Sequence, residues 1–310
     1  MTTTGKGHGR RKTENRGDGG LNRAFCNLHP FVIFFYYLMA ALFLMLYQHP
    51  FFLLSAGPLL FFWNWIIDRG KTVRHWGRML GGLMVLFLLL TPLFNRRGNV
   101  ILFTVFHLPV TLESLLRGAM GALTLFDLLL LFFTLPRTLT GNKFLFLFSR
   151  PFPQWTFAAL MAVRFVPLLA RRLQTLAEVH RTTGIIQQSK RKTSLALMKV
   201  LLSWSLEEGL DTADSMAARG YGSGTRSRYI PYSFRLPDKV GLVILCLLSA
   251  GCFSGWYLGD GVLTLSPLLE PVLLFGREWL FFSLFCILIG FPLIIEGKEA
   301  IQWLYWKRIS

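Results

Sequence analysis

Long apolar blocks alternate with short basic blocks along this chain, and this alternation restricts its fold more than any other feature. Several apolar stretches approach the roughly 20 consecutive residues that an α-helix needs to cross the hydrocarbon core of a bilayer. A water-soluble domain of 310 residues would instead spread its charges through amphipathic patterns. The sequence therefore predicts an all-α polytopic membrane protein.

About six apolar stretches are predicted to be transmembrane helices. The first two are separated by Gln48-His49-Pro50, so we expect them to form an antiparallel hairpin. Residues 100–112 are also apolar, but they are few and interrupted by Pro109, so a partly inserted or interfacial segment is expected there. The predicted spans are approximately residues 31–47, 51–67, 79–94, 115–135, 240–258 and 272–295.

The basic residues indicate how the chain is oriented in the membrane. The 33 Lys and Arg residues outnumber the 16 Asp and Glu residues, and they lie mostly between apolar stretches, as in cytoplasmic loops. The sequence DRGKTVRHWGR at residues 68–78 is therefore expected in the cytoplasm, together with both termini of a multi-pass protein of the cell (inner) membrane. This distribution favours the lipid bilayer, and not nucleic acid, as the partner of the positive charge.

Composition divides the chain into five parts. Between residues 136 and 238 there are 15 basic and six acidic residues and few long apolar runs, which predicts a cytoplasmic unit. Two long amphipathic helices, over residues 158–184 and 193–219, are expected in it. The parts are a basic disordered tail (1–28), a membrane domain of about four spans (29–135), the cytoplasmic unit (136–238), a membrane hairpin (239–297) and a cytoplasmic tail (298–310).

Motifs for catalysis, nucleotides and metals are not apparent. Gly70-Lys71-Thr72 matches the end of a phosphate-binding loop, but Trp65 stands where that loop requires its first glycine. The six histidines occur singly, without the spacing of metal ligands. We therefore expect no enzymatic activity, no metal site and no cofactor in this chain.

Asp127 is the one acidic residue deep within a predicted span, where burying a carboxylate is costly unless it is paired or lines a polar cavity. One hypothesis is a secondary transporter or channel that uses Asp127 on its ion path. The alternatives are a packing contact inside the bundle, for example with Arg117, or a position nearer the membrane interface.

Two glycine pairs, Gly77-x-x-x-Gly81 and Gly251-x-x-x-Gly255, have the spacing that lets transmembrane helices approach closely. Each pair is expected to face either a neighbouring helix of this chain or a helix of a partner subunit. The spacing alone does not distinguish the two.

The stretch ADSMAARGYGSG, residues 213–224, is typical of the last turns of a helix that ends at a glycine. Arg219 would then project near the helix end among small side chains. Such an arginine is suited to reach a carboxylate on a docked surface. The alternative is that Arg219 only interacts with the negative end of its own helix dipole.

Two segments resemble the transmembrane T component of energy-coupling factor transporters, the EcfT or CbiQ-like family. They are VRFVPLL at residues 163–169 and SLEEGLDTADSMAARGY at residues 205–221, and the resemblance extends over about residues 98–235. The resemblance implies a scaffold subunit of a vitamin or metal-ion importer. Its implied partners are two ABC-type ATPase subunits, which bind the ATP, and a small membrane subunit that binds the substrate.

In that family each of two coupling helices ends in a short Ala-Arg-Gly-like motif that docks on an ATPase. The second motif corresponds to Ala218, Arg219 and Gly220. The first should fall at Thr182, Thr183 and Gly184, where the arginine is absent. Either Arg181, two residues upstream of the expected arginine, substitutes for it, or this docking contact is weaker or differently built. The first coupling helix is expected to start at Arg164, Phe165 and Pro167.

Overall fold

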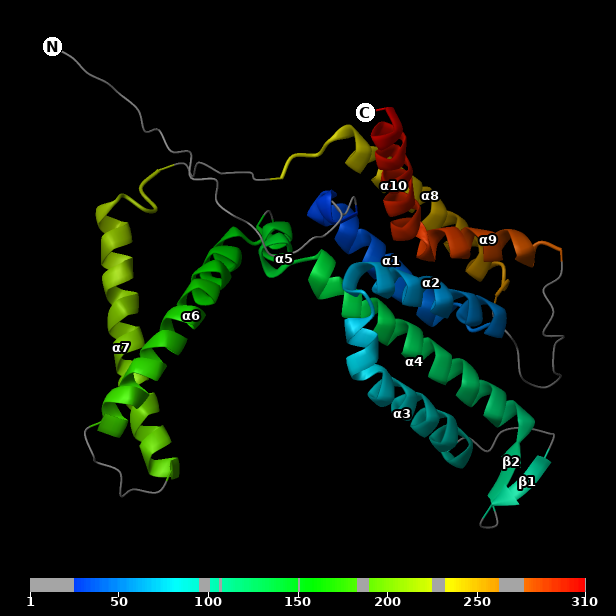
Figure 1. The fold of residues 1–310 in the computed structure, drawn as a ribbon, viewed down its shortest axis with the longest axis horizontal. Coiled ribbons are helices and arrows are strands. Elements are labelled where there is room, and N and C mark those ends of the chain that lie inside the picture. The colour runs from blue at the N-terminus through cyan, green and yellow to red at the C-terminus, as the bar shows by residue number, and fades with distance from the viewer. Residues whose placement is uncertain are drawn as a thin grey trace.

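A computed structural model describes residues 25–94, 101–105, 108–149, 151–182, 190–224, 232–261 and 276–309. Nearly all regular structure in these ranges is helical, as the sequence predicts, and Figure 1 shows one group of helices beside a separate pair, α6 and α7. The elements are η1 (Phe25–Asn27), α1 (Pro30–Leu46), α2 (Pro50–Asp68), α3 (Lys71–Phe94), β1 (Ile101–Val105), β2 (Leu108–Thr111), α4 (Leu112–Thr138), α5 (Gly141–Phe148), α6 (Pro153–Thr182), α7 (Lys190–Ala218), α8 (Leu236–Tyr257), α9 (Glu278–Ile289) and α10 (Phe291–Ile309).

The first two helices begin at the same local motif, a histidine followed by a proline. His29 and His49 are the N-cap residues, and the side chain of each accepts a hydrogen bond from the backbone N–H two residues later. Pro30 and Pro50 occupy the first helical positions, where no N–H is needed. The break between α1 and α2 is therefore set by the local sequence.

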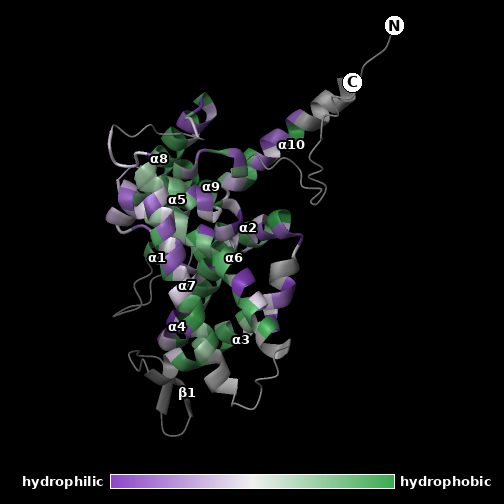
Figure 2. Ribbon diagram, turned by 90° about the vertical axis from the view of Figure 1, so that its left-hand side faces the viewer, coloured by the Kyte–Doolittle hydropathy of each residue, from purple (hydrophilic) through white to green (hydrophobic). Residues whose placement is uncertain are grey.

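Three helices, α2, α4 and α8, are long and apolar enough on their own to cross a membrane. The pair α9 and α10 adds a fourth if its two bent parts form one span, and α1 is apolar but shorter. Figure 2 shows hydrophobic residues along α3 and α4, whereas hydrophilic residues alternate with them along α10. The prediction of an all-α membrane protein is confirmed.

The last predicted span differs from the structure. Residues 272–295 were expected to form one continuous helix, but α9 ends at Ile289 and α10 leaves it at an angle of 58°. Pro292 follows the break at Gly290, and a proline has no N–H to continue the hydrogen bonds of α9. The same proline fits the first turn of the new helix, which explains why the bend lies here.

Two parts of the predicted membrane domain also differ between the sequence prediction and the structure. The strands β1 (Ile101–Val105) and β2 (Leu108–Thr111) pair antiparallel, with Val105 opposite Leu108. Helix α4 continues through Pro136 to Thr138 and so passes the predicted limit of the membrane domain. The short helix α5 then follows, which no periodic pattern in the sequence had indicated.

The core of the protein lies among α1, α2, α4, α8 and α9. Tyr37 donates a hydrogen bond to the Thr134 hydroxyl, and Asn64 donates one to the Leu130 carbonyl, so polar contacts join α4 to the first two helices. The largest fully buried side chains are Trp63, Tyr36, Tyr47, Phe25, Phe43, Phe52, Phe285, Ile33, Leu44, Leu53, Leu60 and Leu130.

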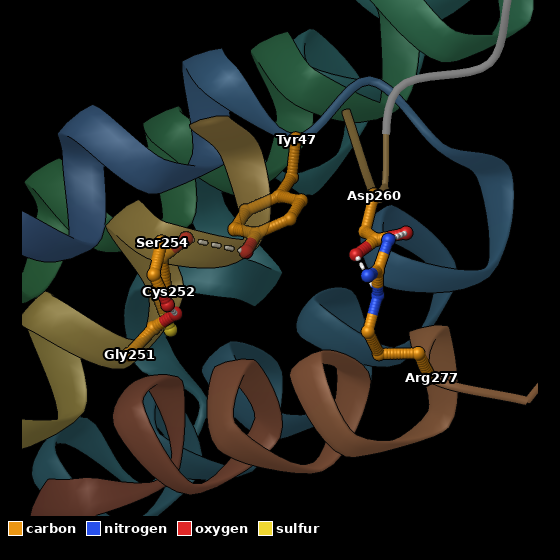
Figure 3. A network of polar contacts seen from close by, with 6 residues as sticks. All are labelled: Tyr47, Gly251, Cys252, Ser254, Asp260 and Arg277. Atoms are coloured by element: carbon orange, nitrogen blue, oxygen red, sulfur yellow. Dashed lines mark hydrogen bonds and ion pairs between the residues drawn. The ribbon is translucent and has the colours of Figure 1, made fainter. Parts of the chain in front are cut away.

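A second set of contacts closes the end of the bundle where α1, α8 and α9 meet (Figure 3). The Tyr47 hydroxyl donates to the Cys252 carbonyl at 2.7 Å. Arg277 and Asp260 form an ion pair through two hydrogen bonds, at 2.9 and 3.3 Å. Gly255 makes the close approach possible, because a Cβ there would lie 2.6 Å from Phe281.

Of the two glycine pairs, Gly251 and Gly255 therefore face a neighbouring helix of this chain. A Cβ at Gly251 would lie 3.0 Å from Leu284 on α9. Gly77 and Gly81 on α3 differ, since no described heavy atom beyond their own helix lies within 4 Å of a Cβ added to either.

Candidate functional site

The helices α6 and α7 form an antiparallel pair that stands apart from the core. Phe157, near the start of α6, stacks on Tyr221 just beyond the end of α7, with ring centroids 5.1 Å apart. Further along, the Arg172 guanidinium lies 4.7 Å from the centroid of the Trp204 ring. The two contacts place the beginning of α6 beside the end of α7.

A groove of about 350 Å³ lies between these two helices. Two basic residues, Arg164 from α6 and Arg219 from α7, line it together with the acidic Glu208 and Asp211. Arg164 and Arg219 are 55 positions apart in the sequence, and the antiparallel pairing brings them to one site. Both arginines were predicted from the sequence as candidate site residues, whereas Glu208 and Asp211, which line the same groove, were not.

The end of α7 has the geometry of a Schellman motif. Gly220 has a φ of 75°, its N–H donates to the Ala217 carbonyl at 2.9 Å, and the N–H of Tyr221 donates to the Met216 carbonyl at 3.0 Å. This conformation favours glycine because a Cβ is strained there. The predicted helix end at Gly220 is thus observed.

Arg219 is the residue immediately before this glycine and is exposed. Its chain neighbours Ala217 and Ala218 are small, and Met161, Asp211 and Met216 line the same groove. No described residue forms a hydrogen bond or ion pair with the Arg219 side chain. The arrangement therefore presents a positive charge at a fixed helix end, available to an external carboxylate.

Comparison with known proteins assigns the family. The profile of the CbiQ family, described as cobalt transport protein, matches residues 27–230, which is more than half of the chain. The chain belongs to the CbiQ family. The resemblance of its sequence to EcfT and CbiQ-like proteins is thereby confirmed.

A relative among the curated proteins agrees with this assignment. The chain is 27% identical over 179 residues to the energy-coupling factor transporter transmembrane protein EcfT of Leuconostoc gelidum subsp. gasicomitatum. The match covers 52% of this chain and 66% of the relative, slightly less than two thirds of that protein. The CbiQ match includes α1 to α7, so the groove and the end of α7 lie within the family region.

The residues predicted for the first docking motif are only partly described. Arg181 and Thr182 are the last two residues of α6. Thr183 and Gly184 lie outside the described residues, so the structure does not test this motif.

The predicted start of the first coupling helix is wrong. Arg164, Phe165 and Pro167 lie inside α6, which begins at Pro153 and continues through Pro167. A proline at the first position favours a helix start because its missing N–H has no partner there in any case. The sequence Pro151-Phe152-Pro153 was therefore the signal for the start of α6.

Asp127 is fully buried in α4, and neither carboxylate oxygen has a hydrogen-bond partner among the described residues. A contact with Arg117 is excluded, because ten residues along one helix correspond to about 15 Å. The neighbouring surface is Gly57 on α2, where a Cβ would lie 3.3 Å from Asp127 Oδ1. Asp127 thus lies at the contact between α2 and α4.

Proposed function

We propose that this member of the CbiQ family is the transmembrane scaffold subunit of an ATP-driven importer of the energy-coupling factor type. Two ABC-type ATPase subunits bind the ends of the coupling helices α6 and α7. A separate small membrane subunit binds the substrate, a vitamin or a metal ion, and the ATP is bound by the ATPases alone.

The observation that carries this proposal is the exposed Arg219 at the end of α7. The Schellman geometry fixes the helix end, and the small neighbouring residues allow a partner to approach closely. An arginine in this setting forms charge-assisted, bidentate hydrogen bonds with a carboxylate. Arg219 therefore binds an acidic groove on an ATPase, and Gly220 holds it in position.

The apolar surface of α7 supports the proposal that this chain also binds a membrane subunit that carries the substrate. Five of its side chains follow a helical spacing on one face, and each is between 58% and 68% exposed: Leu195, Met198, Leu202, Leu206 and Leu210. A continuous apolar stripe of this kind on a long helix indicates contact with another apolar surface. The membrane subunit that binds the substrate provides that surface.

The coupling follows from the stiffness of the two helices. ATP binding and hydrolysis close and open the ATPase pair, and the docked helix ends move with it. Because α6 and α7 are about 30 residues each and pack on one another, they move as rigid elements. The movement reorients the substrate subunit, while this chain hydrolyses nothing.

The experiment is an affinity purification of the tagged protein from its native membrane in mild detergent, followed by mass spectrometry. Two ABC-type ATPases and a small membrane protein are expected with the unchanged chain. In the Arg219→Glu variant the ATPases should be lost, because removing a buried charge contact costs about 2 kcal/mol or more, an affinity loss of about 30-fold.

The matched control is Arg171→Glu, which reverses the charge of another exposed arginine on the same helix pair. This variant should retain the ATPases. If Arg219→Glu retained the complete complex, or if both variants lost it equally, the docking role of Arg219 would be refuted.

One observation favours a second candidate function, a secondary transporter or channel that uses Asp127. The carboxylate is fully buried in the bundle without a hydrogen-bond partner among the described residues. This function requires ion flux through the purified chain in liposomes without any ATPase, and the flux must disappear in Asp127→Asn. Flux that persists in that variant, or no flux at all, eliminates it.

A further inference from the structure

The chain enters and leaves the α6–α7 pair through two segments that meet at one place. Before the pair, α5 carries Phe146, whose ring lies edge-on to the His29 imidazole with centroids 6.0 Å apart. After the pair, Phe234 stacks on this imidazole with ring centroids 3.8 Å apart and an angle of 19° between the rings. Both connections therefore contact His29, the N-cap residue of α1.

The two connections also contact each other. The ring of Phe146 lies 4.9 Å from the ring of Tyr232, which precedes Phe234 by two residues. We name these four residues, His29, Phe146, Tyr232 and Phe234, the aromatic joint. Edge-on and stacked ring contacts of this kind stabilise by about 0.5–1.5 kcal/mol each beyond the area that they bury.

The aromatic joint is fastened to the membrane helices by one buried carboxylate. Asp238, in the first turn of α8, is 4% exposed and accepts two backbone hydrogen bonds. One comes from the N–H of His29 at 2.9 Å and the other from the N–H of Arg235 at 3.0 Å. Asp238 thus holds the start of α1 and the start of α8 together.

A lysine fastens the α5 side of the same place. The Lys143 ammonium donates to the Cys26 carbonyl at 2.6 Å, immediately before α1, and to the Thr138 carbonyl at 3.4 Å, at the end of α4. Burial lowers the pKa of Lys143, and a nearby thiol, Cys26, partly opposes this shift. The start of α5 is therefore tied to η1, the short helix that precedes α1, and to the end of α4.

Apart from the contacts at the aromatic joint and Lys143, the described residues of the α6–α7 pair pack little against the bundle. None of the described residues of α6 and α7 belongs to the buried hydrophobic core, which is formed by the membrane helices and the segments next to them. Figure 1 shows the same separation, with α5 between the pair and the other helices. A force applied to α6 and α7 must consequently pass through α5 and residues 232–235.

We infer that the aromatic joint transmits the movement of α6 and α7 to the starts of α1 and α8. This inference rests on the proposed coupling function and assigns the positioning residues through which the coupling acts. Since the segments before α6 and after α7 both contact the His29 imidazole, a rotation of the α6–α7 pair moves α1 and α8 together. A pair attached at two distant points would instead bend the membrane helices independently.

The test uses the complete complex with its ATPases, in a Cys246→Ser background that removes the exposed native thiol. Two exposed positions receive a cysteine in separate variants, Val200→Cys on α7, which lies off the apolar stripe, and Val240→Cys near the start of α8. Maleimide labelling rates are measured without nucleotide and with ATP plus vanadate. In the unchanged joint, both rates should depend on nucleotide.

The double variant Phe146→Ala with Phe234→Ala removes two rings of the joint and should make the nucleotide responses of the two labelled positions differ. The rate at position 200 keeps its nucleotide dependence, because the ATPases still move α7, whereas the rate at position 240 loses it. Phe234→Tyr with Phe146 unchanged should preserve the response at 240, because a tyrosine ring stacks in the same way. If the double variant does not insert, Phe234→Leu, which keeps apolar bulk without a ring, replaces it with the same expectation.

The control is Phe152→Ala, which removes an exposed ring from the connection between α5 and α6 without touching the joint. A nucleotide response at 240 that survives the loss of the rings, or that disappears equally in the control, overturns the inference. If position 200 does not respond to nucleotide in the unchanged complex, the proposed coupling function itself fails. In that case the role assigned to the joint fails with it.

Discussion

Replacing Asp238 with alanine should destabilise this protein more than removing any ion pair at its surface. Its carboxylate accepts two backbone hydrogen bonds, from His29 at 2.9 Å and from Arg235 at 3.0 Å, and it is 4% exposed. A hydrogen bond to a charged group contributes about 1.5–3 kcal/mol, so Asp238→Ala should cost about 3–6 kcal/mol. The N–H of His29 would also be left without a partner at a buried site.

The matched variant is Asp260→Ala, which removes the ion pair with Arg277. Because the Arg277 side chain is 60% exposed, this pair should contribute only about 0–1 kcal/mol. Asp238→Asn should fall between the two, since an amide keeps one acceptor oxygen and places its NH₂ against the other donor.

The assay is a titration of the purified variants with sodium dodecyl sulfate in one mild detergent, followed by circular dichroism. The free energy of unfolding should decrease in the order wild type, Asp260→Ala, Asp238→Asn, Asp238→Ala. A loss for Asp260→Ala as large as that for Asp238→Ala would refute the reasoning, as would a loss below about 1 kcal/mol for Asp238→Ala.

Three further predictions use the same titration. Burial lowers the pKa of His29, although Asp238 partly opposes this. The imidazole therefore binds a proton more readily in the unfolded chain than in the folded one, so the free energy of unfolding should fall as the pH drops through about 6.5. This fall should be smaller in His29→Asn, which cannot take up the proton but keeps a capping acceptor. Gly255→Ala should destabilise by about 1–3 kcal/mol, because the added Cβ would lie 2.6 Å from Phe281. Gly81→Ala meets no described neighbour and should stabilise by up to about 1 kcal/mol. Equal effects of the two substitutions would contradict the assigned packing of Gly255. Asp127→Asn should stabilise by about 1 kcal/mol or more, because it removes the cost of burying or protonating a carboxylate that has no partner among the described residues. A decrease in stability would show that Asp127 does have a stabilising partner.

Much of the fold could be predicted because its signals are local. An apolar run of sufficient length forms a helix in lipid, where every backbone N–H and C=O needs a partner within its own segment. The end of α7 is equally local, since the hydrogen bonds around Gly220 involve only Ala217, Met216 and Tyr221. The predicted helix end therefore agrees with the structure to within two residues.

Other features carried a local signal that the sequence analysis missed or misplaced. Pro292 marks the bend between α9 and α10, and Pro153 marks the start of α6, yet both lie in or beside stretches whose apolar character continues. Hydropathy averages over such breaks, while a proline acts at one residue. The β1–β2 hairpin was also unpredicted, because a short apolar run does not distinguish strand from helix.

By itself, the sequence determined the membrane class, most of the helices, the family and the two arginines of the candidate site. Tertiary structure alone decided which distant residues meet, because such contacts depend on how helices pack and not on any periodicity. The pairing of α6 with α7 brings Arg164 to Arg219, and the packing of α2 on α4 leaves Asp127 against Gly57. The packing of α1 beside α8 likewise places the N–H of His29 on a carboxylate 209 residues away, where the two connections to the coupling helices converge.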